Sequence, residues 1–115
     1  MQIINTSGNL STLDIYRMTK SPETQKMSAA KGQRLEVAKW VVYEDVNKKD
    51  DEPVLLLALV TNGGETYATN SATFINDFVD MWELFADASE TIPAIKVVSN
   101  TSKAGREFIT CVYSE

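Results

Sequence analysis

A chain of 115 residues, of which 43% are hydrophobic, is long enough to bury one core and too short for a second domain. It contains no histidine and a single cysteine, which excludes histidine-based acid–base catalysis, histidine-liganded zinc, a thiolate metal site and an internal disulfide. The net charge of -5 argues at first against a polyanionic partner.

The charge is distributed unevenly along the chain. Residues 1–43 carry six basic and three acidic side chains, residues 44–90 carry two and eleven, and residues 91–115 carry three and two. This segregation predicts a basic face on an acidic protein, although scatter of the charges over the surface stays an alternative. There is no signal-peptide pattern and no apolar run of transmembrane length, so we expect an intracellular, cytoplasmic protein.

The first 31 residues have only short apolar pieces between Ser, Thr, Asn and Gly. They predict an arm, residues 1–31, packed on a domain formed by residues 32–115. Residues 12–18 fit a strand or a single helical turn. The Ser-Pro pair at residues 21–22 is a typical helix start, and a helix beginning there would end near Gly32. The arm residues expected to pack on the domain are Ile3, Ile4, Leu13 and Ile15.

Leu35 to Glu44 is predicted as the first long strand, and its apolar alternation slips by one position midway. The slip predicts a β-bulge or strong coiling, which bends the strand and lets a small barrel close. The inward set would be Leu35, Val37, Trp40 and Val42, and the outward set Lys39, Val41 and Tyr43. The charged run over residues 44–52 predicts a solvated loop that ends at Pro53.

Residues 53–70 predict a hairpin around which the rest of the domain is arranged. Residues 54–60 are an unbroken apolar run, typical of a central, buried strand. The Asn62-Gly63 pair supplies the positive φ angles of a two-residue primed turn, and residues 65–69 resume with β-favouring side chains.

A helix follows, because residues 70 and 71 offer a cap and apolar residues then recur at helical spacing. Its core stripe would be Phe74, Ile75, Phe78, Val79, Met81, Trp82 and Phe85, and its acidic face Asp77, Asp80, Glu83 and Asp87. Two more strands are predicted at residues 92–98 and 107–113, joined by a basic loop over residues 99–106. Cys111 lies in the last strand, where a buried thiol in a reducing compartment is the simplest interpretation.

Three antiparallel strands, a helix and two further strands are the order of an OB-fold. We therefore predict a mainly β protein, a five-stranded OB-fold-like barrel with its helix between strands three and four. The outer face of the middle strands and two loops of such barrels bind oligonucleotides, with bases stacked on aromatic rings and phosphates beside Lys and Arg. With the arm beside this groove, the predicted nucleic-acid-binding residues are Tyr16, Arg17, Lys20, Arg34, Lys39, Trp40, Tyr43, Lys48, Lys49, Tyr67, Lys96, Lys103 and Arg106. For Trp40, Tyr43 and Tyr67 a position in the core stays an alternative.

Residues 8–21, 68–75 with Asp77-Phe78, and 101–108 together resemble small single-stranded DNA-binding proteins encoded by phages of Gram-positive bacteria. The similarity spans most of the chain. The resemblance implies an OB-fold that coats single-stranded DNA without sequence specificity during phage genome replication. Cooperative contacts between protomers on the DNA stay open as a role for the arm.

A second hypothesis is an acidic inhibitor that imitates DNA and binds a host protein. The acidic face of the predicted helix, with Asp50 and Asp51, supplies the charge for such a role. DNA binding predicts an affinity that falls with salt, whereas mimicry predicts a protein partner and no affinity for DNA. Under either hypothesis we expect no enzymatic activity, no catalytic residue, no metal, no cofactor and no membrane partner.

Overall fold

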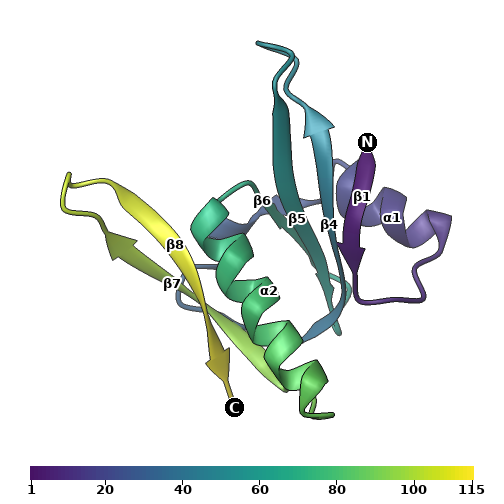
Figure 1. The fold of residues 1–115 in the computed structure, drawn as a ribbon, viewed down its shortest axis with the longest axis vertical. Helices are drawn as coiled ribbons and strands as arrows, with labels where there is room; N and C mark the ends of the chain where they lie inside the picture. Colours follow the sequence, from purple (N-terminus) through teal and green to yellow (C-terminus); the bar gives the residue numbers. More distant parts are fainter.

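The computed structural model describes all 115 residues and contains two β-sheets with a long helix between them (Figure 1). The five-stranded sheet has the order β1 (Gln2–Thr6), β4 (Val37–Val46), β5 (Pro53–Thr61), β6 (Thr66–Thr69) and β2 (Gln25–Lys26). The three-stranded sheet has the order β3 (Arg34–Leu35), β7 (Ala94–Thr101) and β8 (Glu107–Ser114). The helices are α1 (Thr12–Thr19), the short 3₁₀ helix η1 (Met27–Ala30) and α2 (Ala72–Asp87). None of them is long and apolar enough to cross a membrane.

The predicted bend in the first long strand is confirmed. The chain pairs with β7 through β3, passes Glu36, and then pairs with β5 through β4. The register between β4 and β5 shifts between Val37 and Lys39, which marks the bulge. We call the cluster of 15 buried residues around α2 the main core. Because of this shift, Leu35, Trp40 and Val42 all lie in the main core although their spacing is irregular.

The predicted barrel closure is wrong, because the two sheets are open. Closing a five-stranded barrel would require β6 to pair with β8, and no such pairing exists. The free edge of β6 is instead occupied by β2, through the parallel pairs Gln25 with Tyr67 and Lys26 with Ala68. The N-terminal segment therefore takes the hydrogen-bonding edge that barrel closure would have needed.

The hairpin of β5 and β6 is confirmed, but its turn differs from the expected two-residue type. The amide of Gly64 donates to the carbonyl of Thr61, and the amide of Thr61 donates to the carbonyl of Glu65. Gly64 has a φ of 88°, whereas Asn62 is not in the positive-φ region. This is a three-residue loop, in which the left-handed residue follows the turn rather than beginning it.

Helix α2 joins the two sheets through the main core. Its N-cap is Ser71, whose hydroxyl accepts from the amide of Phe74, as the sequence predicted. The rings of Trp40 and Phe78 meet edge to face with centroids 5.4 Å apart, and Trp82 stacks on Phe78 at 5.5 Å. Phe74 and Phe78 are fully buried, so the aromatic stripe fills the space between the sheets.

The N-terminal arm is more structured than the sequence suggested. Residues 12–19 form a full helix, because Ser11 and Asp14 make a reciprocal capping box. The predicted helix start at Ser21 is wrong: residues 21–24 form a turn, and the only helix between Ser21 and Gly32 is the short η1. The arm packs on the domain through Leu10, Met18, Met27 and Ala30, whereas Ile3, Ile4 and Leu13 are exposed.

A second, smaller core lies under α1, on the face of the five-stranded sheet that points away from α2. Met18 of α1 is buried there against Val41, Tyr43 and Ala58 of β4 and β5. This packing covers the outer face of the middle strands, on which the predicted oligonucleotide groove would lie.

Candidate nucleic-acid interface

The three aromatic residues predicted to stack on bases at the centre of the groove are buried. Trp40, Tyr43 and Tyr67 are only 2%, 4% and 3% exposed, so none presents a ring face to solvent. Tyr43 lies on the outward face of β4, as expected, but it is buried because Met18 of α1 covers it. Burial raises the pKa of Tyr43, and to a lesser extent the charge of Asp45 does the same. These rings therefore belong to the two cores.

A first group of predicted residues lies on and around α1. Lys20 Nζ is 3.0 Å from Asp45 Oδ2, and Lys39 Nζ is 2.8 Å from Asp14 Oδ2. Hydrogen bonding from Lys20, with the amide of Val46 as a smaller cause, lowers the pKa of Asp45 and keeps this carboxylate charged. Two of the basic residues in this group are thus neutralised within the protein.

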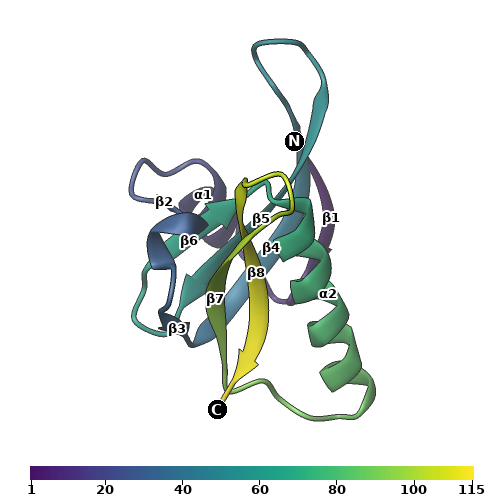
Figure 2. The same ribbon diagram turned by 90° about the vertical axis from the view of Figure 1, so that its left-hand side faces the viewer.

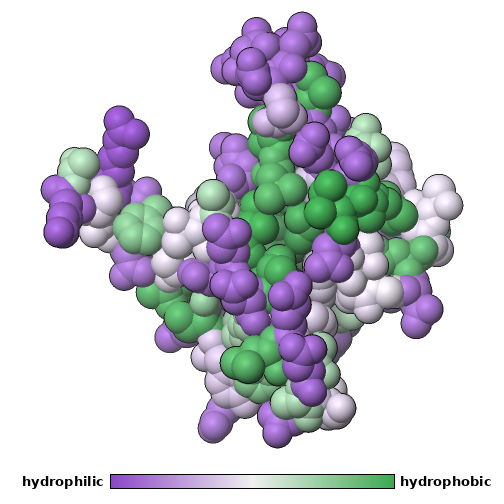
Figure 3. Space-filling view, in the orientation of Figure 1, coloured by the Kyte–Doolittle hydropathy of each residue, from purple (hydrophilic) through white to green (hydrophobic).

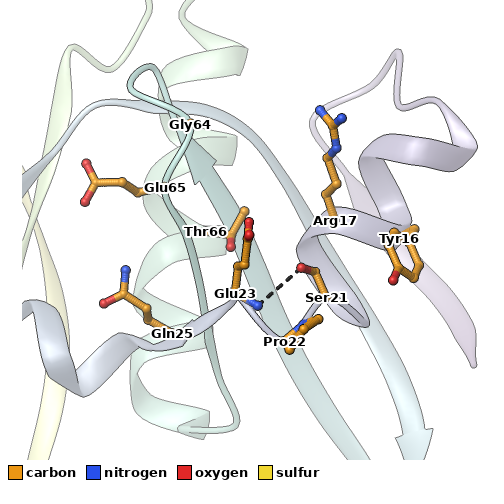
Figure 4. A pocket seen from close by; sticks show the side chains of 9 residues that line it. All are labelled: Tyr16, Arg17, Ser21, Pro22, Glu23, Gln25, Gly64, Glu65 and Thr66. Carbon is orange, nitrogen blue, oxygen red and sulfur yellow. Dashed lines mark hydrogen bonds between the residues drawn. The ribbon is translucent and has the colours of Figure 1, made fainter.

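Tyr16 and Arg17 also lie on α1 and line an open cavity of about 450 Å³ (Figure 4). The opposite wall comes from Gln25 and from the turn between β5 and β6. Glu23 and Glu65 line the same cavity, so its one arginine is outnumbered by two carboxylates. The arrangement can hold a polar group, but its net charge disfavours phosphate.

A second group occupies the loop between β4 and β5. Lys48 and Lys49 are exposed there and make no ion pair. Asp50, Asp51 and Glu52 follow directly in the same loop, so its total charge is negative. The loop projects from the molecule as one of two hydrophilic tips in Figure 3.

The third group lies on the three-stranded sheet and its hairpin loop. Arg34 of β3 is directly opposite Lys96 of β7, and Lys103 and Arg106 lie in the loop between β7 and β8, the second hydrophilic tip in Figure 3. Arg34 is held by Glu36 at 2.9 Å and by the backbone carbonyl of Glu115 at 2.9 Å. The other three are exposed and have no carboxylate within 4.0 Å.

These groups do not share one groove. Helix α1 and the β7–β8 hairpin lie on opposite sides of the molecule, with α2, β4 and β5 between them (Figures 1 and 2). The structure thus places Arg34 and Lys96 on the three-stranded sheet, with Lys103 and Arg106 in its hairpin loop, and separates all four from the residues on α1.

One aromatic residue beside the third group was not among the predicted site residues. Phe108 of β8 is partly exposed and belongs to neither core cluster. Its neighbours in sequence on the buried face are Ile109 and Cys111. The period-two alternation of β8 was the signal for an outward ring at Phe108, but the strand is apolar enough to resemble a buried one throughout.

The side chains that could carry chemistry are few. No cluster of three His, Cys, Asp or Glu residues is arranged to hold a metal ion. Cys111 is buried, and burial, with the nearby charge of Asp77, raises the pKa of its thiol to about 12. What the exposed side chains offer to a ligand is therefore hydrogen bonding, charge and aromatic stacking.

The sequence matches the model of the family described as phage single-stranded DNA-binding protein, of the Phi29 type, over residues 2–114. Neither a search of curated proteins nor a search of solved structures gives a match. The match covers the arm, both sheets and the hairpin loop that carries Lys103 and Arg106. The chain therefore belongs to the family of phage single-stranded DNA-binding proteins.

Proposed function

We propose that this protein coats single-stranded DNA without sequence preference during replication of a phage genome, in the cytoplasm of the host cell. The observation that carries the proposal is the family match over nearly the whole chain. The arrangement of charge supports it, because four of the eleven basic side chains (Lys20, Lys31, Arg34 and Lys39) pair with carboxylates and the other seven do not. Unpaired surface Lys and Arg near a single strand release counterions and favour binding regardless of base sequence.

The scaffold we propose for this function is an open variant of the OB-fold. A bent first strand that pairs with both β5 and β7, the pairing of β7 with β8, and a helix between β6 and β7 are features of that topology. Residues 32–115 would supply this domain. Residues 1–31 would supply an arm that covers the face of β4 and β5 pointing away from α2. An open barrel keeps the β7–β8 hairpin free to project from the molecule.

We further propose that the protein works by binding alone, without enzymatic activity or cofactor, as the family description supports. The competing hypothesis of a DNA mimic has one observation in its favour, since Asp80, Glu83 and Asp87 are exposed on α2 and none is in an ion pair. Affinity for DNA itself distinguishes the two hypotheses, because a mimic binds a protein partner and not DNA.

The test is a titration of labelled oligothymidine with the full chain at about 50 mM and about 200 mM salt, followed by anisotropy. We expect binding at low salt, an affinity that falls as salt rises, and weaker binding to a duplex of the same length. A second oligonucleotide of mixed sequence should bind with nearly the same affinity. Absence of any complex at micromolar protein and low salt would reject DNA binding and favour the mimic.

A further inference from the structure

We propose that single-stranded DNA lies along the outer face of the three-stranded sheet, with a base stacked on Phe108 and phosphates beside Lys96, Lys103 and Arg106. We define the outer face as the side of β3, β7 and β8 that points away from α2. The inference rests on the single-stranded DNA binding proposed above and assigns it a surface.

The register of the strands defines which residues share this face. Arg34, Lys96 and Val112 are opposite one another across the three strands, and Asn100 is opposite Phe108. The alternate residues of β7 and β8 are buried in the main core, which places this set outward. The amide nitrogen of Asn100 donates to Thr110 Oγ1 at 3.1 Å, a contact that requires both side chains to lie on the same face.

The outer face is free of negative charge along the hairpin. The three strands contain one acidic residue, Glu107, which by alternation is on the opposite face and pairs with Lys31. Lys96, Lys103 and Arg106 are exposed and unpaired, in contrast to Lys20 and Lys39 on the other side of the molecule. In a chain with a net charge of -5, this face is where a polyanion meets the least repulsion.

The position of Phe108 is that of a stacking platform rather than of a core residue. Its side chain is partly exposed, and it joins neither of the two core clusters. The neighbouring Asn100 can donate to or accept from any base, which suits binding without sequence preference. A ring between Lys96 on one side and Lys103 and Arg106 on the other reproduces the combination of stacking and phosphate contacts found in single-strand binders.

The dimensions of the hairpin fit a short stretch of DNA. β7 has eight residues and therefore a length of roughly 26 Å at about 3.3 Å per residue. Lys96 is near its start and Lys103 lies beyond its end, so positive charge brackets most of that length. The competing surface is the face of β4 and β5 that points away from α2. That face is covered by α1 and by the side chain of Met18.

The experiment compares variants of the outer face with variants matched in charge elsewhere. Full-length wild type, Phe108→Leu, Phe108→Tyr, Lys103→Ala/Arg106→Ala and Lys48→Ala/Lys49→Ala are titrated with the same labelled oligothymidine. Thermal melting of each protein verifies that it is folded. The two double variants each remove two positive charges from an exposed hairpin loop, so they differ in location only.

We expect Phe108→Leu to weaken binding about 5- to 150-fold, which corresponds to the roughly 1–3 kcal/mol of one base–ring stack. Phe108→Tyr keeps the ring and should bind within about threefold of wild type. Lys103→Ala/Arg106→Ala should flatten the salt dependence by about one to two units of slope, as expected for two lost phosphate contacts. Lys48→Ala/Lys49→Ala should change the slope much less.

Two other outcomes separate this inference from the function on which it rests. If wild type binds oligothymidine but Phe108→Leu binds equally well and both double variants lose the same amount, the DNA lies elsewhere and the outer face is rejected. If wild type itself does not bind, DNA binding fails and the assignment of a surface fails with it.

Discussion

Lys39 of β4 and Asp14 of α1 are joined by a hydrogen-bonded ion pair, with Nζ and Oδ2 2.8 Å apart. Asp14 is also the third residue of α1 and completes its capping box, since its carboxylate accepts from the amide of the N-cap Ser11. One carboxylate therefore starts the helix and ties it to the sheet. It also explains why Lys39, expected to face a groove, is engaged within the fold.

The first prediction concerns the pH dependence of this tie. Hydrogen bonding from Lys39, followed by that from the Ser11 amide, lowers the pKa of Asp14 to about 2. A carboxyl whose pKa is lowered by folding stabilises the protein fully above its ordinary pKa, and this stabilisation is lost as the pH falls through the folded value. Asp14→Asn should therefore lower the Tm at neutral pH, and the Tm difference from wild type should shrink between about pH 4 and about pH 2.

The control for this prediction is Asp80→Asn, which changes an exposed carboxylate on α2 that makes no ion pair. Its Tm should stay close to that of wild type at every pH. A Tm difference for Asp14→Asn that persists unchanged at acidic pH would show that the side-chain charge is not what stabilises α1.

The second prediction concerns the ring cluster between the sheets. Phe78 is fully buried between Trp40 and Trp82, so Phe78→Ala should lower the free energy of unfolding by about 3–5 kcal/mol. Urea unfolding followed by tryptophan fluorescence measures this change. Leu84→Ala, on the same helix but 67% exposed, should stay within about 0.5 kcal/mol of wild type. Equal effects of the two substitutions would contradict the packing of α2.

The third prediction separates the role of the arm in stability from a role in DNA binding. Met18 is 1% exposed under α1, and Met18→Ala should cost about 2–5 kcal/mol of unfolding free energy. Leu13→Ala on the same helix should cost little, because Leu13 is 54% exposed. Measured well below the Tm, Met18→Ala should bind oligothymidine as wild type does. A large loss of affinity in the folded variant would place DNA on the α1 side.

The fourth prediction concerns the single thiol. Cys111 is buried and its pKa is raised to about 12, mainly by burial, so the reactive thiolate is scarce at about pH 8. A disulfide-exchange reagent should label the native protein far more slowly than the protein in urea. Labelling of the native protein at the rate of a free cysteine would mean that the edge between β8 and α2 opens readily.

Most of the local structure follows from patterns in the sequence. Apolar patterns predicted β4, β5, β6, α2, β7 and β8 in the correct order. Helical spacing marked α2, an unbroken apolar run marked β5, and β-favouring residues after the Asn62-Gly63 turn marked β6. The slip between Val37 and Lys39 predicted the bulge, and Ser71 predicted the cap of α2. Family membership could also be recognised from sequence, since it depends on pattern along the whole chain.

The place of the arm, and with it the openness of the fold, depends on long-range pairing that the sequence does not reveal. Nothing in the two residues of β2 shows that they would pair with β6, because a parallel pairing between distant segments leaves no local signal. Likewise, the alternation of β4 correctly predicts that Val41 and Tyr43 share its second face, but only the docking of Met18 makes that face a core. The location of the candidate site also depends on the docking of α1. With α1 covering one face, the register of β3 against β7 places Arg34 opposite Lys96 on the other sheet, and this pairing is not visible in sequence spacing. Lys103 and Arg106 lie in the hairpin loop at the far end of that sheet.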